Sequence, residues 1–115
     1  MTDPVSDIAR ATAGRLGDEY SPSLAADVEV ALRHEAGVPR TYADPISIAG
    51  LIVAIASLAW SIYTELRRWR STPAPLAENV AQAVRLRFGE DHVLDDTAKA
   101  VIDVAAEETV KRGGN

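Results

Sequence analysis

One stretch of the chain differs from the rest in its pattern of hydrophobic and polar positions. The 20 residues between Asp44 and Glu65 carry no charged side chain, whereas charged residues are frequent before and after them. As a helix, residues 45–64 would be about 30 Å long, because an α-helix rises about 1.5 Å per residue. That length matches the hydrocarbon thickness of a bilayer. The pattern therefore predicts one hydrophobic helix, over residues 44–70, that is long enough to span a membrane.

Before this stretch, apolar residues recur at the spacing of two amphipathic helices. The first covers residues 4–16 and ends at Gly17, and the second covers about residues 22–36 and ends at Gly37. Each begins with an Asp or Ser followed by proline, a pair that favours the first turn of a helix. The predicted inward faces consist of Val5, Ile8, Ala9, Thr12 and Leu16 in the first helix, and of Leu24, Ala25, Val28, Ala31 and Leu32 in the second.

After the stretch, the prolines of residues 71–75 interrupt the helix and form the clearest linker. A fourth helix fits residues 76–88 and ends at Gly89, and a fifth runs from an N-cap at Asp95 or Asp96 to about Arg112. The predicted inward residues are Leu76, Ala77, Val80, Ala81, Ala83, Val84 and Phe88, followed by Ala98, Val101, Ile102, Ala105 and Val110.

These elements predict an all-α chain of about five helices, in which one central hydrophobic helix is flanked by two amphipathic helical hairpins. The predicted division is an acidic N-terminal hairpin (1–43), the hydrophobic helix as a single transmembrane span (44–70), a proline-containing linker (71–75) and a C-terminal hairpin (76–115).

The two hairpins resemble each other in sequence. Residues 8–20 and 80–92 align with four identities, and each segment is followed by an amphipathic helix after a short loop. One interpretation is a duplicated hairpin that gives two similar docking units. The other is that two helix–glycine–acid joints in an alanine-rich chain are similar by composition alone.

Composition restricts the classes of function. The chain has 115 residues, no cysteine and 17 acidic against 12 basic side chains, for a net charge of −5. A chain of this length is one small domain, and if a quarter of it lies in a bilayer the remainder is too small for a deep enzyme core. The missing cysteines exclude disulfides and thiolate chemistry. The excess of acidic over basic side chains argues against a nucleic-acid partner, because binding phosphates requires a basic surface.

Residue types suited to catalysis do not occur at a recognisable spacing. His34 lacks the second histidine one turn later that a zinc-protease helix requires. His92 lies in an acidic segment, but the spacing fits no calcium-binding loop, and a solvated loop with a helix cap explains it better. The acidic neighbours are Glu90, Asp91, Asp95 and Asp96. We therefore expect no enzymatic activity, no cofactor and no metal.

Aromatic and basic residues cluster at the ends of the hydrophobic helix. They form a predicted membrane-interface collar of Tyr42, Trp60, Tyr63, Arg67, Arg68, Trp69 and Arg70. In the alternative interpretation, the arginines face water at the end of a soluble helix and Trp69 packs in a core. Because three arginines closely follow the segment, the C-terminal half is expected to face the cytoplasm.

Small and hydroxyl residues recur within the hydrophobic helix at steps of three and four. This predicted helix-packing stripe consists of Ser47, Gly50, Ala54, Ser57 and Ser61. Small residues let two helices approach closely in a membrane. The alternative is that alanine and serine are common in any helix and the repeat has no function.

Together these patterns predict a small, non-enzymatic, membrane-anchored interaction or adaptor protein. Its expected partners are membrane lipid, a second copy or another membrane helix through the hydrophobic helix, and a protein that binds the acidic hairpins. Two alternatives remain open at this stage. The first is a soluble, self-assembling bundle with the hydrophobic helix as its core, and the second is an effector that disrupts membranes.

Overall fold

The computed structural model describes residues 4–20, 22–37, 48–69, 77–90 and 92–113, except for the side chains of residues 34–37 and 69. Within these residues the regular structure is entirely helical, which confirms the predicted all-α class. The five helices are α1 (Pro4–Tyr20), α2 (Leu24–Gly37), α3 (Ile48–Trp69), α4 (Ala77–Phe88) and α5 (Asp96–Gly113).

Two helix boundaries differ from the predicted ones. Helix α1 continues past Gly17 to Tyr20, and this glycine has no left-handed backbone conformation that would end a helix there. Helix α2 begins two residues later than predicted, after Ser23. The Asp27 amide donates to the Ser23 carbonyl oxygen (2.9 Å), and the Ser23 hydroxyl lies 3.2 Å from the Asp27 carboxylate.

The start of α5 agrees with one of the two predicted caps. The Asp95 carboxylate accepts a hydrogen bond from the Ala98 amide (2.8 Å), and its carbonyl oxygen accepts one from Lys99 (3.0 Å). An acidic N-cap of this kind pairs an amide that has no partner within the helix. Asp95, rather than Asp96, is therefore the N-cap of α5, which begins at Asp96.

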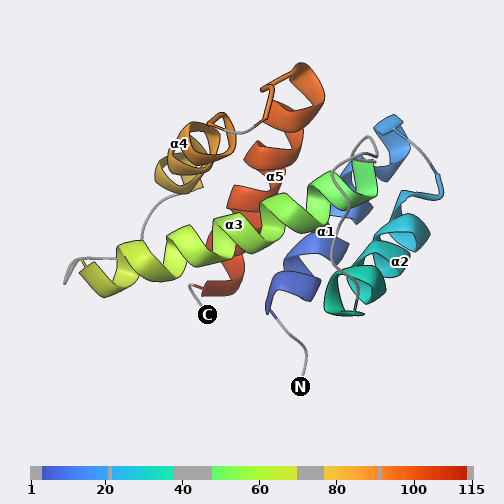
Figure 1. The fold of residues 1–115 in the computed structure, drawn as a ribbon, viewed down its shortest axis with the longest axis horizontal. Helices are drawn as coiled ribbons and strands as arrows, with labels where there is room; N and C mark the ends of the chain where they lie inside the picture. Colours follow the sequence, from blue (N-terminus) through green and yellow to red (C-terminus); the bar gives the residue numbers. More distant parts are fainter. Residues whose placement is uncertain (1–3, 21, 38–47, 70–76, 91, 114–115) are drawn as a thin grey trace.

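Helix α3 lies across the other four helices (Figure 1). Contacts connect α4 with α5, α5 with α1, and α1 with α2, so these helices form a row in that order. Helix α3 contacts each member of the row and forms a second layer over it. The Cα radius of gyration is 13.6 Å, close to the roughly 13 Å of a compact domain of this length. One side of α3 is thus packed on protein along most of its length.

The core forms along this inner side of α3. Ile52, Ile55, Ala56, Ala59 and Tyr63 have no more than 1% of their surface exposed. The alanines bring the helix backbone close to the row below, and the isoleucines fill the space beside them. The other helices contribute the predicted positions Ile8, Ala9, Leu16, Leu24, Val28, Val80, Ala81, Val84, Phe88, Ala98, Val101, Ile102 and Ala105. Ala25 was also predicted to face inward, and it is exposed.

Two buried threonines are paired within their own helices. The hydroxyl of Thr12 donates to the Ile8 carbonyl oxygen, and that of Thr109 to the Ala105 carbonyl oxygen, both at 2.7 Å. A hydroxyl that bonds its own helix needs no polar partner across the core. Thr12 therefore fills a core position, as its place on the apolar face predicts.

The duplication of the hairpins stays a hypothesis. The aligned residues Ile8 and Val80 are both buried, as are Leu16 and Phe88. Any two amphipathic helices would show this likeness. The aligned glycines differ, because α1 runs through Gly17 whereas Gly89 lies in a turn after α4.

The two hairpins pack against each other beneath α3. Arg15 of α1 lies 2.9 Å from the Glu107 carboxylate and 3.3 Å from that of Glu108 on α5. Asp7, near the start of α1, and Arg112, near the end of α5, are 3.9 Å apart. The hairpins are thus on the same side of α3 and in direct contact.

Candidate functional site

The outer side of α3 carries small polar residues of the predicted helix-packing stripe. Ser57 and Ser61 are exposed, Ala54 is partly buried and Gly50 is buried, whereas Ser47 lies outside the described residues. The Ser57 hydroxyl donates to the Val53 carbonyl oxygen at 3.1 Å. Burial of the stripe therefore decreases along α3, from the buried Gly50 to the exposed Ser57 and Ser61. The exposed members do not contribute to the core.

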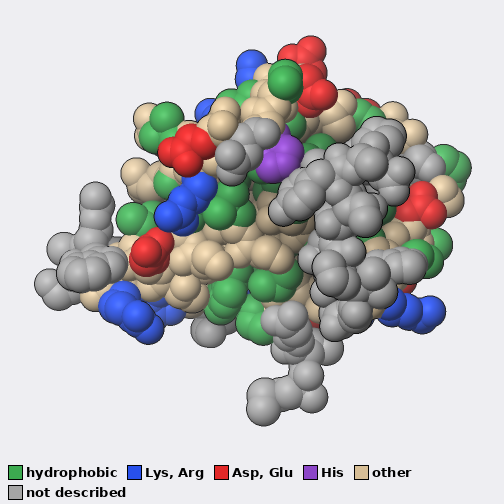
Figure 2. Space-filling view, viewed as in Figure 1, with side chains coloured by type: hydrophobic (Ala, Val, Ile, Leu, Met, Phe, Trp, Pro, Cys, Tyr) green, Lys and Arg blue, Asp and Glu red, His purple; other side chains and the backbone are tan. Residues whose placement is uncertain are grey.

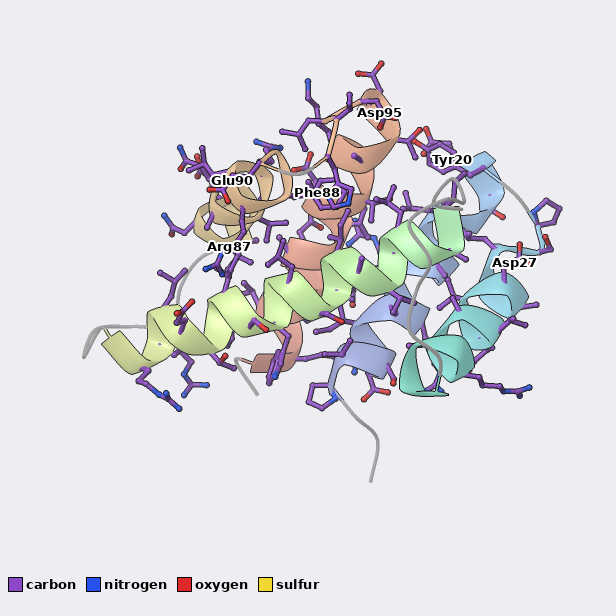
Figure 3. The ribbon with its side chains drawn as sticks, in the orientation of Figure 1. Tyr20, Asp27, Arg87, Phe88, Glu90 and Asp95 are labelled. Carbon is purple, nitrogen blue, oxygen red and sulfur yellow. The ribbon has the colours of Figure 1, made fainter. Side chains whose placement is uncertain are left out.

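A groove runs along the surface between α3 and α4, and it consists of two adjoining hollows that share Arg87. The first, called here the His92 hollow, has a volume of about 410 Å³ and is lined by Ala54, Ser57, Leu58, Ser61, Arg87, Phe88 and His92. The second, the Leu86 hollow, has a volume of about 370 Å³ and is lined by Ile62, Glu65, Leu66, Ala83, Leu86, Arg87 and Glu90. Figure 3 shows Arg87 between α4 and α3.

The lining residues define the direction and length of this α3–α4 groove. Residues 54–61 of α3 face the end of α4, whereas residues 62–66 face its middle, so the two helices run antiparallel. From Ala54 to Leu66 the groove is about 18 Å long at the usual helical rise. This length corresponds to about three turns of another helix. The groove is shallow and open, and Figure 2 shows apolar side chains (green) between the polar ones along this face.

Charged side chains line both hollows of the groove. Within the described chain, Glu65, Arg87 and Glu90 form no ion pair. Some surface arginines elsewhere are paired with carboxylates of a neighbouring helix, such as Arg10 with Glu29 and Arg85 with Asp103, whereas Arg68 is not. The groove therefore presents a free guanidinium and free carboxylates next to apolar side chains.

Leu86 and Val93 are the exposed apolar residues closest to the groove. Leu86 is 72% exposed on the rim of its hollow, and Val93, adjacent to His92, is 83% exposed. The sequence pattern predicted the inward positions of α4 and so did not identify this face. The sequence feature that could have identified this face is Leu86, an apolar residue between Arg85 and Arg87 that does not belong to the four-residue repeat of buried positions.

The predicted membrane-interface collar divides among different environments. Tyr63 is 1% exposed and stacks on the half-buried Trp60, with ring centroids 5.8 Å apart. Arg67 lies over the Tyr63 ring, 5.9 Å from its centroid, and donates to the Gly113 carbonyl oxygen at 3.0 Å. Arg68 is exposed. Tyr42, Arg70 and the side chain of Trp69 lie outside the described residues.

In this fold, Tyr63 and Arg67 hold the end of α5 against α3. Within the described chain, the Tyr63 hydroxyl is buried without a hydrogen-bond partner. Tyr63 is buried in this contact, whereas Arg67 is exposed at the surface.

The acidic segment around His92 has local structural roles. The His92 ring stacks on Phe88 with centroids 4.4 Å apart, and Asp95 caps α5. Among the described residues, no group of three or more His, Asp or Glu side chains could hold a metal ion. His34 lies in α2, but its side chain is outside the description.

Two further observations concern the whole chain. Helix α3 is long and apolar enough between Ile48 and Arg68 to cross a membrane, and half of its most apolar 18-residue window is buried inside the protein. No protein-family model, curated protein or solved structure matches the chain. The case for function therefore depends on the geometry of the groove and of α3.

Proposed function

We propose that this chain is a non-enzymatic interaction protein, a helical bundle built around α3 that binds a helix of a protein partner in the α3–α4 groove. The observation that carries this proposal is the groove itself, in which free charges adjoin exposed apolar surface. Amphipathic helices bind such grooves through apolar residues spaced one turn apart.

The dimensions of the groove favour a helix over a small molecule. Its two hollows are open along one side, whereas small-molecule sites usually enclose most of the ligand. Ala54, Ser57 and Ser61 have short side chains, so they leave room for another backbone to approach α3. Free charges on the rim would then orient the bound helix.

The role proposed for α3 as a core helix is supported by the position of the hairpins. A single membrane span would hold the two hairpins on opposite sides of a hydrocarbon layer about 30 Å thick. Here they are in contact through Arg15 and the carboxylates of Glu107 and Glu108. The outer side of α3 also exposes Ser57, Ser61, Thr64 and Glu65, which gives lipid little apolar surface.

Cysteine labelling tests this role directly, because the chain has no cysteine of its own. We expect Ser57→Cys to react with a membrane-impermeant maleimide in detergent-free buffer. Ala59→Cys, two residues away and buried, should react at least about tenfold more slowly because it requires local unfolding. Equal protection of both positions, together with recovery of the protein only in the membrane fraction, would contradict a core role for α3.

Photocrosslinking in cells tests the groove. A photoreactive phenylalanine analogue in place of Leu86 should give one discrete protein adduct, which Arg87→Glu should abolish. The same analogue in place of Val30, an exposed apolar residue of α2, is the control and should not give that adduct. Failure of the Leu86 position to give any protein adduct would argue against binding in the groove.

A membrane-anchored protein is the second candidate, favoured by the length and hydropathy of α3. In that form the apolar side of α3 would face lipid, the hairpins would separate, and the C-terminal half would face the cytoplasm. Such a protein resists extraction with alkaline carbonate. Release of the full chain by carbonate would exclude an integral membrane state.

A further inference from the structure

The hydroxyl group of Tyr63 is buried where the end of α5 meets α3. The residue is 1% exposed, and within the described chain its hydroxyl has no hydrogen-bond partner. A Cβ atom built at Gly113 would lie 2.6 Å from this oxygen, so the last residue of α5 lies directly against it. A hydroxyl that has lost water and gained no partner opposes the contact that buries it.

Arg67 makes a polar contact that favours the same arrangement. Carbonyl groups in the last turn of a helix have no partner within that helix, and the Gly113 carbonyl oxygen accepts a hydrogen bond from the Arg67 guanidinium at 3.0 Å. Arg112 lies 3.9 Å from the Asp7 carboxylate, and both side chains are partly exposed. A surface ion pair of this kind contributes little to stability. The contact thus combines the favourable Arg67 hydrogen bond with the unfavourable burial of the Tyr63 hydroxyl.

From this balance we propose that residues 109–113 of α5 form a strap, which opens from α3 while the rest of the bundle stays folded. In the open state water hydrates the Tyr63 hydroxyl, and Trp60, which stacks on the Tyr63 ring, gains exposure. Arg67 holds the strap closed, since it bonds Gly113 only in the closed state. Tyr63 and Gly113 do not line the α3–α4 groove, so this conformational change is separate from the function proposed above.

The rate at which a buried thiol reacts measures the opening of the strap. Thr109 is completely buried within the strap, and Ile102 is completely buried nearer the middle of α5. Thr109→Cys should react with a thiol reagent at least about tenfold faster than Ile102→Cys, because the second position requires the bundle to unfold. Equal rates at the two positions would overturn the proposal, because they would show that α5 opens only as a whole.

Two substitutions on α3 should shift the opening in opposite directions. Tyr63→Phe removes the cost of burying the hydroxyl, so the reaction at Thr109→Cys should become at least about fivefold slower. Arg67→Gln removes the hydrogen bond to the strap and should make it at least about fivefold faster. Tyr20→Phe, in α1, is the matched control and should leave the rate unchanged. An unchanged or faster rate in Tyr63→Phe, or an unchanged rate in Arg67→Gln, would overturn the proposal.

Tyrosine nitration tests the strap without an introduced cysteine. Nitration of Tyr63, read by mass spectrometry of its peptide, should be at least about fivefold faster in Arg67→Gln than in the original chain. Nitration of Tyr20 should be equal in the two proteins. Acceleration at both tyrosines would overturn a local strap, because it would mean that loss of the Arg67 guanidinium loosens the whole bundle. No acceleration at Tyr63 would show that this hydrogen bond does not control its exposure.

Discussion

At the scale of single residues, the contact between the end of α5 and α3 depends on the missing side chain of Gly113. A Cβ atom built there would lie 2.2 Å from Cε1 of Tyr63, far inside van der Waals contact. The tyrosine ring is 1% exposed, so it has little space into which to move. The same glycine accepts the hydrogen bond from Arg67. Gly14, within α1, differs in that a Cβ there would meet nothing within 4 Å.

These surroundings predict that replacing glycine by alanine has opposite effects on the free energy of unfolding at the two positions. Gly113→Ala should lower the free energy of unfolding by about 1–3 kcal/mol, because it overpacks the contact with Tyr63. Gly14→Ala should raise it by about 0.5–1 kcal/mol, because alanine loses less backbone entropy in a helix. Urea denaturation followed by circular dichroism measures both. Equal stabilisation by the two changes would show that α5 does not end against Tyr63.

At the scale of the elements, an ion pair connects α1 and α2. The Arg10 Nε atom lies 2.8 Å from one Glu29 carboxylate oxygen and 3.0 Å from the other. This hydrogen bonding lowers the pKa of Glu29 below its ordinary value. Desolvation opposes the shift, and the positive charges of Arg10 and Arg33 add to it. The pair is exposed, so it is also sensitive to salt.

The lowered pKa predicts how the contribution of this pair depends on pH. A carboxylate with a lower pKa in the folded state stabilises the fold at pH values above its unfolded pKa, about 4.3. That contribution is lost as the pH falls through the folded pKa. Glu29→Gln should therefore lower the urea midpoint at pH 7. The difference in urea midpoint between this variant and the original chain should disappear at pH values below the folded pKa.

The partner substitution provides the control for this prediction. Arg10→Gln should reduce the urea midpoint at pH 7 in the same way. The double variant should be no less stable than the loss of the pair alone requires, because the core is intact and either single change already removes the pair. Additive losses in the double variant would show that Arg10 and Glu29 do not act as a pair.

At the scale of the whole molecule, α3 is the helix that connects all the others. It contacts α1, α2, α4 and α5, and the α1–α5 contact joins the two hairpins beneath it. Its buried residues therefore contribute to one continuous core rather than to two separate ones. Unfolding should be cooperative, because neither hairpin can bury its apolar face without α3.

Ile55→Ala tests this cooperativity. Ile55 is completely buried, so the substitution should cost about 2–5 kcal/mol through lost apolar burial and an unfilled cavity. Trp60 and Trp69 fluorescence and far-ultraviolet circular dichroism should still report one coincident transition. Ile55→Val, which removes a single methylene, should cost about 0.5–1.5 kcal/mol. Two separate transitions would mean that the hairpins fold independently of α3.

The amino-acid sequence by itself determined the helices and most of their inward faces. Periodicity and caps are local properties, and they predicted the buried positions Ile8, Val80, Val84 and Ile102. They also predicted a cap at Asp95 or Asp96, of which the structure uses Asp95. They were less accurate at the helix ends, since Gly17 lies within α1 and α2 begins after Ser23. Ending a helix at glycine requires a change of backbone conformation, which composition alone does not impose.

Only the tertiary structure decided which side of α3 packs on the other helices and which lies on the surface of the bundle. Hydropathy predicts that residues 45–64 avoid water, but lipid and the apolar faces of other helices satisfy that requirement equally well. The fold buries Ile55 and Ala59 against the row of helices, and it leaves Ser57 and Ser61 on the surface. The α3–α4 groove likewise combines Glu65 with Leu86 and Arg87, which are about 20 residues apart in sequence. No local pattern joins these residues, because their proximity follows from the antiparallel packing of two helices separated by a linker.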